Sequence, residues 1–284
     1  MARALTHAWF NGTAMPLAQV SVSPLDRGYL FGDGVYEVIP VYDGRALGVD
    51  QHVRRLRASL AAIRLSLDIT DAALYTAFND VVAANGEGDM SLYIQVSRAG
   101  DDGRDHRFPA AVDANVFIMA CALTPASARV YANGISAVTM NDERWLRCDI
   151  KATSLLANVL ARQTADASDA AEAILTRNGQ LVEGATSAIG CVFDGDVSLP
   201  PHSRLLLPSI TRELMIECAR RSGITVNETP VSVDAMRGAR EILLMSSTRE
   251  IAPVVTLDNE PVGTGKPGPV WAALFNAYQQ LKQH

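Results

Sequence analysis

The feature that most restricts the fold is the alternation of short apolar, strand-like runs with amphipathic helical segments along the chain. Residues 50–67 repeat apolar side chains at helical spacing, and residues 71–84 follow a potential N-cap, Thr70, which predicts two helices. The other expected helices are 153–166, 211–222 and 269–284, and the expected strands are 35–42, 90–98, 114–122, 129–140, 171–175, 181–192, 241–246 and 253–257. Strands and helices intermixed in this way predict an α+β or mixed α/β fold.

Length and hydrophobicity allow two domains. A chain of 284 residues, 48% of them hydrophobic, can bury a large core and has the length of two domains or one large one. Residues 123–128 begin Leu-Thr-Pro-Ala-Ser and form a candidate linker. This linker would separate a small N-terminal α/β domain, residues 1–122, from a larger C-terminal domain, residues 129–284.

Charge and hydropathy argue against nucleic-acid and membrane partners. The formal net charge is -6, so the chain lacks the basic footprint that nucleic acid requires. No apolar run approaches the roughly 20 residues of a membrane span, and residues 1–10 do not resemble a secretion signal. Four widely spaced cysteines fit no metal-binding pattern and predict reduced, mostly buried thiols in a cytoplasmic protein. They are Cys121, Cys148, Cys191 and Cys218.

Lysine is rare, and its distribution marks one residue. Of 25 lysine and arginine residues only three are lysine, and Lys151 is the only one before Lys266. Arginine stays protonated, whereas a lysine amine can lose its proton and form a Schiff base. A central lysine in an arginine-rich chain is therefore a candidate for covalent chemistry, and a lone surface lysine is the alternative interpretation.

Three polar segments could help to bind a phosphate. Residues 207–211 place hydroxyl groups and backbone N–H groups at the start of an expected helix, which suits a dianion, although Ser209 or Thr211 could simply cap the helix. Residues 245–249 end a strand with three hydroxyl-bearing side chains and could form a second wall of the same site. The glycines of residues 31–34 lack the spacing of a phosphate loop and favour a tight turn.

The polar loop at residues 99–109 contains an arginine and a histidine two positions apart. Arg104 and His106 could both point into one cleft and hold a carboxylate, the arginine through two parallel hydrogen bonds. A solvated polar loop is the alternative interpretation. Loops of this size inside a domain are often functional.

Taken together, these segments resemble one family, the fold-type IV pyridoxal phosphate enzymes. This group contains the branched-chain and D-amino acid aminotransferases and the aminodeoxychorismate lyases, and the similarity is greatest to the bacterial D-amino acid aminotransferases. The similarity covers essentially the whole chain. The matching segments are 26–37 (Asp-Arg-Gly-Tyr-Leu-Phe-Gly-Asp-Gly-Val-Tyr-Glu), 52–56, 93–98, 144–151, 172–175, 183–184 and 210–212.

The resemblance implies a two-domain enzyme whose C-terminal domain binds pyridoxal 5'-phosphate. Lys151 would form the aldimine with the cofactor and then move a proton between the substrate Cα and the cofactor C4′. Glu183 would face the pyridine nitrogen and keep the ring protonated, and Arg55 would bind the phosphate. The further cofactor contacts implied are Arg144, Thr186, Leu207, Ile210, Thr211 and Ser247.

The resemblance also implies the substrate. Arg104 and His106, together with Tyr36, match the residues that trap the substrate α-carboxylate in the D-amino acid enzymes. We therefore expect transamination of D-alanine, D-glutamate and similar D-amino acids with 2-oxoglutarate or pyruvate, by a cytoplasmic homodimer. The alternatives are an aminotransferase for branched-chain L-amino acids or primary amines, an aminodeoxychorismate lyase, and a non-catalytic binding protein.

The chain departs from the family pattern at three places. Ala188 stands where asparagine is common, Pro208-Ser209 replaces a frequent lysine–glycine pair, and Arg249 replaces a small polar residue. Ala188 removes an amide from the surroundings of the cofactor, and Arg249 adds charge. We expect these changes to affect cofactor affinity and substrate range rather than the fold.

Overall fold

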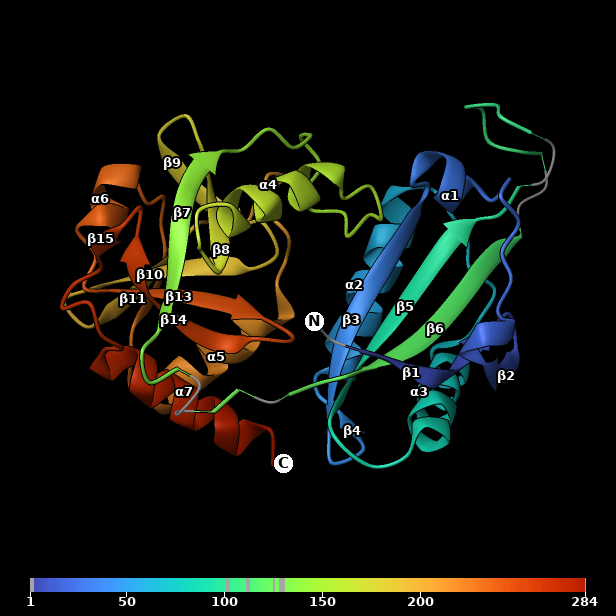
Figure 1. The fold of residues 1–284 in the computed structure, drawn as a ribbon, viewed down its shortest axis with the longest axis horizontal. Coiled ribbons are helices and arrows are strands. Elements are labelled where there is room, and N and C mark those ends of the chain that lie inside the picture. The colour runs from blue at the N-terminus through green and yellow to red at the C-terminus, as the bar shows by residue number, and fades with distance from the viewer. Residues whose placement is uncertain (1–2, 101–102, 111–112, 125, 128–130, 284) are drawn as a thin grey trace. The chain divides into compact units, whose positions relative to one another are not determined.

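The computed structural model describes residues 3–100, 103–110, 113–124, 126–127 and 131–283 (Figure 1). The chain forms two compact units. The first contains Met1–Thr124 and Ile150–Leu155, and the second contains Pro125–Asp149 and Leu156–His284. Ile150–Leu155 thus packs with the N-terminal part, although the sequence placed it in the second domain. Residues 125 and 128–130 of the expected linker and strand lie outside the described residues.

The first unit is built on a six-stranded sheet in which every pairing is antiparallel. Its strand order is β2-β1-β6-β5-β3-β4. The strands are β1 (Ala4–Phe10), β2 (Thr13–Pro16), β3 (Gly34–Tyr42), β4 (Arg45–Ala46), β5 (Met90–Arg98) and β6 (Ala114–Ala122). The three strands predicted in this part, at 35–42, 90–98 and 114–122, are confirmed as β3, β5 and β6.

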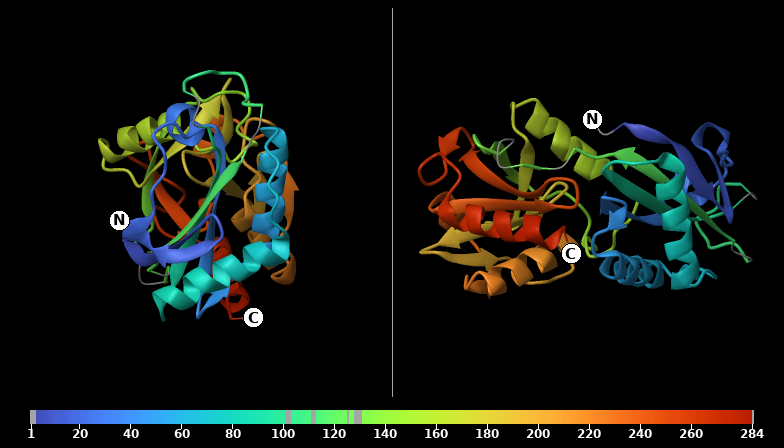
Figure 2. Two further views of the ribbon diagram at one scale, coloured as in Figure 1. Left: turned by 90° about the vertical axis from the view of Figure 1, so that its right-hand side faces the viewer. Right: turned by 90° about the horizontal axis from the view of Figure 1, so that it is seen from below.

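Two helices supply the other half of the core of this unit. Helices α2 (Val49–Ala62) and α3 (Asp71–Asn85) pack apolar side chains against alternate residues of the sheet (Figure 2). Thr70 accepts a hydrogen bond from the N–H of Ala73, which confirms the predicted N-cap. The expected helix at 50–67 ends earlier because Arg64 has φ 55°, a left-handed conformation that a helix cannot continue through.

The second unit contains a nine-stranded mixed sheet with the order β12-β11-β10-β13-β14-β7-β8-β9, to which β15 adds beside β14. The strands are β7 (Ile135–Asn141), β8 (Glu172–Arg177), β9 (Gln180–Gly184), β10 (Ala188–Phe193), β11 (Asp196–Leu199), β12 (Val226–Glu228), β13 (Glu241–Ser246), β14 (Glu250–Leu257) and β15 (Glu260–Pro261). The segment 181–192, expected as a strand broken by glycines, forms two strands, β9 and β10, with the break after Gly184.

Helices cover this sheet. Helix α4 (Leu156–Asp166) packs on β7 and β8, whereas α5 (Ile210–Arg221) and α7 (Pro269–Leu281) pack on one another and on β13 and β14. Helix α4 begins three residues later than expected because the side chains of Thr153 and Ser154 hydrogen-bond to the backbone of Gly32 instead of starting a helix. Among the described residues, no helix is long and apolar enough to cross a bilayer.

The elements that sequence patterns missed are mostly short. They are β1, β2, β4, β11, β12 and β15, the 3-10 helix η1 (Leu17–Gln19), and the helices α1 (Arg27–Phe31) and α6 (Val233–Arg237). All but β1 have five residues or fewer, too short for a periodic pattern to emerge. The four cysteines are free, and all but Cys121 are buried, as expected.

Candidate active site

Backbone contacts hold the segment around Lys151 in the first unit. The N–H of Tyr36 donates to the Lys151 carbonyl at 2.9 Å, and the Lys151 N–H donates to the Ser59 Oγ at 3.2 Å. Val35 and Ala152 form a β-bridge beside them. The Lys151 Nζ lies 4.3 Å from the centre of the Tyr36 ring, within the range of a cation–π contact. The lysine side chain therefore starts from a fixed backbone and rests on an aromatic face.

The glycine-rich turn after α1 docks this lysine segment. Gly32 ends α1 with φ 66°, and its carbonyl accepts hydrogen bonds from the hydroxyls of Thr153 and Ser154, both at 3.1 Å. The Thr153 N–H also donates to the Gly34 carbonyl at 3.0 Å. A Cβ at position 32 would lie 2.5 Å from the Ser154 Oγ, so only glycine fits. Residues 31–34 thus form the tight turn that the sequence favoured.

Arg55 is bound to a buried carboxylate. Its Nε and Nη2 donate to the two oxygens of Glu37, each at 2.7 Å, and the His52 Nδ1 lies 2.7 Å from Glu37 as well. Burial would raise the pKa of Glu37, but the Arg55 charge and the hydrogen bonds from Arg55 and His52 outweigh it and lower the pKa from 4.5 to about 2. Burial lowers the pKa of His52. Glu37 thereby fixes the orientation of the guanidinium expected to bind phosphate.

Arg104 and His106 lie on an exposed loop of the same unit, and both contact Phe31. The His106 and Phe31 ring centres are 5.0 Å apart, and the Arg104 Cζ lies 5.3 Å from the Phe31 ring centre. The structure thus gathers the two expected carboxylate-binding residues around one ring. Within the described residues, it records no hydrogen bond from either side chain to Tyr36, the third expected member of the trap.

Glu183, in β9, is a buried acid of the second unit. Its Oε1 accepts a hydrogen bond from the Arg144 Nη1 at 2.6 Å, and its Oε2 accepts one from the Leu207 N–H at 3.0 Å. Arg144 also binds Asp142, with its Nε 2.9 Å from Oδ1, so one guanidinium serves two carboxylates. Burial is the largest influence and raises the pKa of Glu183 to about 7, although Arg144 and the Leu207 N–H oppose it.

The start of α5 lies in the same unit. Ser209 is the N-cap and accepts a hydrogen bond from the Arg212 N–H at 3.2 Å, so its hydroxyl has the capping role that the sequence left open. Ile210 and Thr211 are buried in the first turn, and the Thr211 side chain interacts with the buried hydroxyl of Tyr278. The backbone N–H groups of this turn, with the helix dipole, are what the element offers to an anion.

Arg249 organises the neighbouring turn between β13 and β14, which also carries Ser247. Its Nη2 donates to the Thr186 Oγ1 at 3.0 Å and to the buried Glu172, and Thr186 donates to Glu172 at 3.0 Å. Ala188 pairs with Met245 at the edge of this region. Glu172 thus balances the charge that Arg249 adds, and Thr186 is hydrogen-bonded to both residues.

Each unit, taken by itself, carries groups of the kind that pyridoxal 5'-phosphate requires. The first unit has a lysine amine and an oriented arginine, and an arginine can bind a phosphate. The second unit has a helix N-terminus, which also suits a phosphate. It also has Glu183, a buried carboxyl whose raised pKa a cationic partner such as a protonated ring nitrogen would lower.

Sequence reasoning missed the residues that hold the expected ones. Glu37 and His52 orient Arg55, whereas Ser59 and Thr153 bind the backbone of the Lys151 segment. Glu37 gave a signal, because it is the charged residue of a strand that is otherwise apolar and buried. His52 gave a weaker one, because Arg55 and Ser59 are also polar and buried on its helix. Ser59 and Thr153 gave none, because their partners lie far away in the chain.

Comparison with known proteins agrees with this set of groups. The sequence model of one protein family, described as amino-transferase class IV, matches residues 34–257 of this chain. A D-alanine aminotransferase of Bacillus licheniformis is 36% identical over 270 residues, which cover 95% of each chain. One of Staphylococcus haemolyticus is 37% identical over 280 residues, covering 96% of this chain and 98% of the relative.

Solved structures show the same fold. The branched-chain amino acid aminotransferase of Escherichia coli has a TM-score of 0.90 at 27% identity and covers 98% of this chain and 94% of its own. That of Thermobaculum terrenum, solved in its pyridoxal phosphate form, has a TM-score of 0.87 at 24% identity, covers 99% of this chain and 95% of its own, and supports the fold alone.

These matches confirm the fold class predicted from the sequence, the transaminase activity and pyridoxal phosphate as the cofactor. The family model spans most of the chain, and relatives at 36% and 37% identity span more than nine tenths of it. The chain therefore belongs to the class IV aminotransferases, a family of pyridoxal-phosphate-dependent enzymes.

Proposed function

We propose that this transaminase acts on D-amino acids, D-alanine and D-glutamate among them, with 2-oxo acids such as 2-oxoglutarate or pyruvate as acceptors. The observation that carries the proposal is the similarity to D-alanine aminotransferases, at 36% identity over 95% of the chain. The loop that presents Arg104 and His106 on one ring supports it, because these are the groups expected to bind an α-carboxylate.

Lys151 is the proposed catalytic base. Pyridoxal phosphate supplies a carbonyl that accepts the amino group and a ring that withdraws electrons from the substrate Cα. The Lys151 Nζ would hold the cofactor and would remove the substrate Cα proton, a role that needs an amine able to lose its own proton. The Tyr36 ring, 4.3 Å from Nζ, limits where that amine can move.

The residues proposed to bind the cofactor include one acid, one arginine and several neutral hydrogen-bonding groups. Glu183 is the acid proposed to face the ring nitrogen, and Arg144 and Leu207 hold its two oxygens in place. Arg55, oriented by Glu37, is proposed to bind the phosphate. The remaining proposed contacts are the first-turn N–H groups of Ile210 and Thr211 and the side chains of Ser247 and Thr186.

The side of the cofactor on which the carboxylate binds would decide the stereochemistry. If Arg104, His106 and Tyr36 hold the carboxylate, the Cα–H bond of the D-enantiomer would point at Lys151. The L-enantiomer would direct another substituent at the lysine.

The visible absorption of the purified protein with pyridoxal phosphate tests this proposal. The bound cofactor should absorb, and D-alanine without any 2-oxo acid should bleach that band while L-leucine leaves it unchanged. Bleaching by L-leucine alone would overturn the D-specific carboxylate trap but leave Lys151 as the cofactor lysine. A protein that shows no band with pyridoxal phosphate would refute the role of Lys151.

A branched-chain L-amino acid substrate is the second candidate, because the solved structures similar in fold include branched-chain amino acid aminotransferases, one of them at 27% identity. Turnover of L-leucine without turnover of D-alanine would establish it. Pyruvate release without any amino acceptor would instead indicate lyase activity.

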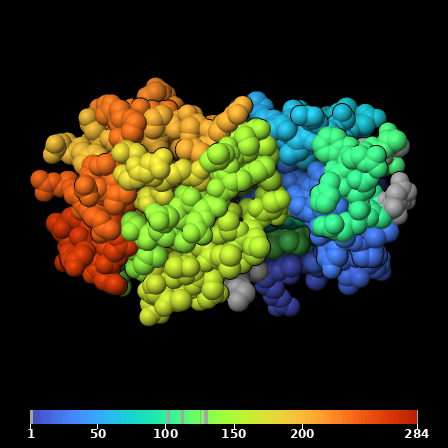
Figure 3. All heavy atoms as spheres, turned by 90° about the horizontal axis from the view of Figure 1, so that it is seen from above, coloured from blue at the N-terminus to red at the C-terminus, as the bar shows by residue number. Residues whose placement is uncertain are grey.

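We propose further that the enzyme is a homodimer. Helix α4 lies on the surface of the second unit (Figure 3, yellow-green), and it exposes an apolar stripe with helical spacing. The stripe consists of three large apolar side chains: Leu156, which is 72% exposed, and Val159 and Leu160, each 59% exposed. Contiguous apolar side chains exposed to water are typical of an interface with another protein chain. A monomer in sedimentation at micromolar concentration would contradict this expectation.

A further inference from the structure

One buried arginine, Arg27, binds the loop that carries Arg104 and His106. Arg27, at the start of α1, is 6% exposed. Its Nη1 donates to the backbone carbonyls of Asp105 and, at 3.2 Å, Arg107, and its Nη2 donates to the carbonyl of His106 at 3.4 Å. Its Nε donates to the Asp33 Oδ2 at 2.9 Å. One side chain thus binds three consecutive peptide groups of an otherwise exposed loop.

The ring of Phe31 completes this anchor. The Arg27 Cζ lies 4.8 Å from the Phe31 ring centre, on the same ring that His106 and Arg104 contact. Because Arg27 and Phe31 are the first and last residues of α1, this short helix presents both the hydrogen-bond donor and the ring. Helix α1 therefore contacts His106 through its backbone and its side chain, and it contacts Arg104 through its side chain and holds the next peptide carbonyl, that of Asp105.

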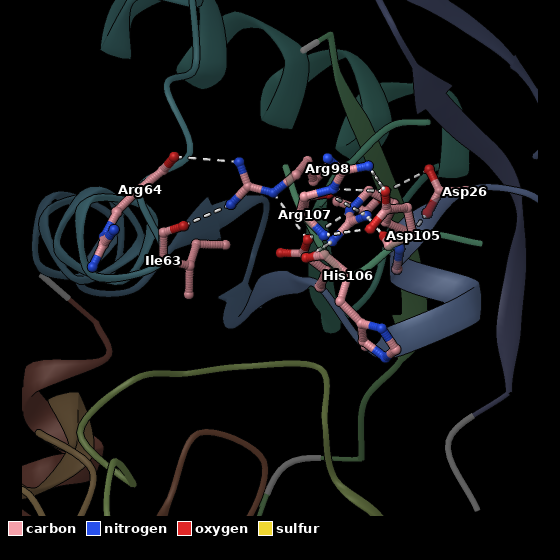
Figure 4. Close-up of polar contacts among 12 residues, drawn as sticks. Asp26, Ile63, Arg64, Arg98, Asp105, His106 and Arg107 are labelled. Atoms are coloured by element: carbon pink, nitrogen blue, oxygen red, sulfur yellow. Dashed lines mark hydrogen bonds and ion pairs between the residues drawn. The ribbon is translucent and has the colours of Figure 1, made fainter. Parts of the chain in front are cut away.

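A second arginine, Arg98, binds the same carboxylate as Arg27, that of Asp33. Arg98 donates to the Asp33 Oδ2 at 2.9 Å and to the carbonyls of Ile63 and Arg64, as Figure 4 shows in part, and its Cζ lies 3.8 Å from the Phe108 ring centre. Figure 4 also shows Asp105, His106 and Arg107 drawn together on the loop. Arg98 thus ties Asp33 to the end of α2, whereas Arg27 binds the peptide groups on both sides of His106.

We propose that Arg27, with Phe31, is the positioning residue for the substrate-binding loop and thereby sets the affinity for the substrate α-carboxylate. The inference rests on the proposed function of Arg104 and His106. Arg27 is buried and engaged with the loop and Asp33, so it acts through the loop rather than on the substrate. A loop released from Arg27 would populate the binding conformation less often, and the apparent affinity would fall by the same fraction.

The test uses the holoenzyme and the variants Arg27→Met and Arg27→Lys. Methionine keeps the approximate length of the side chain without donors, and lysine keeps the charge but cannot bind Asp33 and three carbonyls at once. We expect the KM for D-alanine to rise about 10-fold in Arg27→Met, less in Arg27→Lys, with kcat within about threefold of wild type. A fall in kcat at unchanged KM would overturn the proposal.

A second readout needs neither cofactor nor activity. Trypsin should cut after Arg104 or Arg107 faster in Arg27→Met than in wild type, because the loop opens more often. Arg57→Lys is the matched control: Arg57 binds Asp71 and the carbonyls of Leu67 and Ile69, another connection of the same unit. Cleavage after Arg104 and Arg107 at the wild-type rate in Arg27→Met would overturn the anchoring role.

The two readouts separate this inference from the proposed function. Loop cleavage that rises while the KM for D-alanine stays constant would overturn the link between the anchor and the substrate. Wild-type protein without activity on D-alanine would overturn the D-amino acid proposal, and with it the carboxylate role, while the cleavage rates would still decide whether Arg27 holds the loop. If Arg27→Met does not fold, Phe31→Leu should produce the same increase in KM and in cleavage.

Discussion

The two units each bury a glutamate against an arginine, but the two pairs differ in their charge balance. In the first unit Glu37 receives two hydrogen bonds from Arg55 and a third from His52, and its pKa is lowered to about 2. In the second unit Glu183 receives one hydrogen bond from Arg144, which also serves Asp142, and its pKa is raised to about 7.

This difference separates a structural acid from one suited to chemistry. Glu37 has its positive partner already, so its charge is compensated inside the folded protein. Glu183 shares Arg144 with Asp142, to which Arg177 also binds, and it is burial that raises its pKa. A cation placed beside Glu183 would lower this pKa and be stabilised in return. This difference supports the proposed roles, in which Glu37 orients Arg55 and Glu183 faces the ring nitrogen of the cofactor.

The largest expected effect comes from removing the proposed catalytic base of the first unit. Lys151→Ala should lower the rate of transamination by about 10⁴-fold, because the amine proposed to transfer the proton is lost. The free energy of unfolding of this variant should change little, since the hydrogen bonds of the backbone of residue 151 with Tyr36 and Ser59 remain. Steady-state assays measure the loss, and the exposed Lys266→Arg is the control. Activity within about tenfold of wild type in Lys151→Ala would assign the proton transfer to another residue.

Glu37→Gln should affect stability more than any other substitution in the comparison. The substitution removes the carboxylate of a buried ion pair, and the free energy of unfolding should fall by about 3–5 kcal/mol. Chemical denaturation of the cofactor-free protein measures the change, with the exposed Glu87→Gln as control in the same unit. A loss below about 1 kcal/mol would show that Glu37 and Glu183 are equivalent.

Glu183→Gln should show the opposite profile. The rate of transamination should fall by about 10²-fold, because the acid proposed to stabilise charge at the cofactor is lost. The free energy of unfolding of the cofactor-free protein at about pH 8 should stay constant or rise, since a charge that burial disfavours has been removed. Paired rate and denaturation measurements, with Glu260→Gln as control, check both parts. A large loss of stability with an unchanged rate would reverse the assignment.

Local patterns predicted much of the scaffold. The strands expected at 90–98, 114–122 and 241–246 match β5, β6 and β13 to the residue, because each is a mainly apolar run that polar or glycine-containing segments bound. The helix expected from residue 153 began later, because Thr153 and Ser154 bond to Gly32. Partners so distant in the chain leave no local signal.

The same limit applies to the site. The rarity of lysine pointed to Lys151 from the residues alone, and the resemblance supplied Glu183 and Arg55. Neither pointed to Arg27, whose acceptors are backbone carbonyls 78 to 80 positions away and carry no side-chain signature. Burial and shared hydrogen bonds, which distinguish Glu37 from Glu183, likewise exist only in three dimensions.

The smallest expected effect is the pH dependence of stability, which should differ in sign between the two glutamates. The pKa of Glu37 is lowered from 4.5 to about 2, so its contribution is present above about pH 4.5 and is lost as the pH falls toward 2. At about 1.4 kcal/mol per pH unit, this lowered pKa corresponds to a few kcal/mol of stability. The difference between wild type and Glu37→Gln should shrink over this range.

Glu183 should act in the neutral range and in the opposite direction. Its pKa is raised from 4.5 to about 7, so the folded cofactor-free protein binds the extra proton, and the stability from this group is full below about pH 4.5 and is lost as the pH rises through 7. Denaturation of wild type and Glu183→Gln between about pH 5 and 8 should show wild type losing stability relative to the variant by about 1 kcal/mol per pH unit. Parallel curves for the two proteins would mean that Arg144 compensates Glu183 as fully as Arg55 compensates Glu37, and the distinction between the two acids would fail.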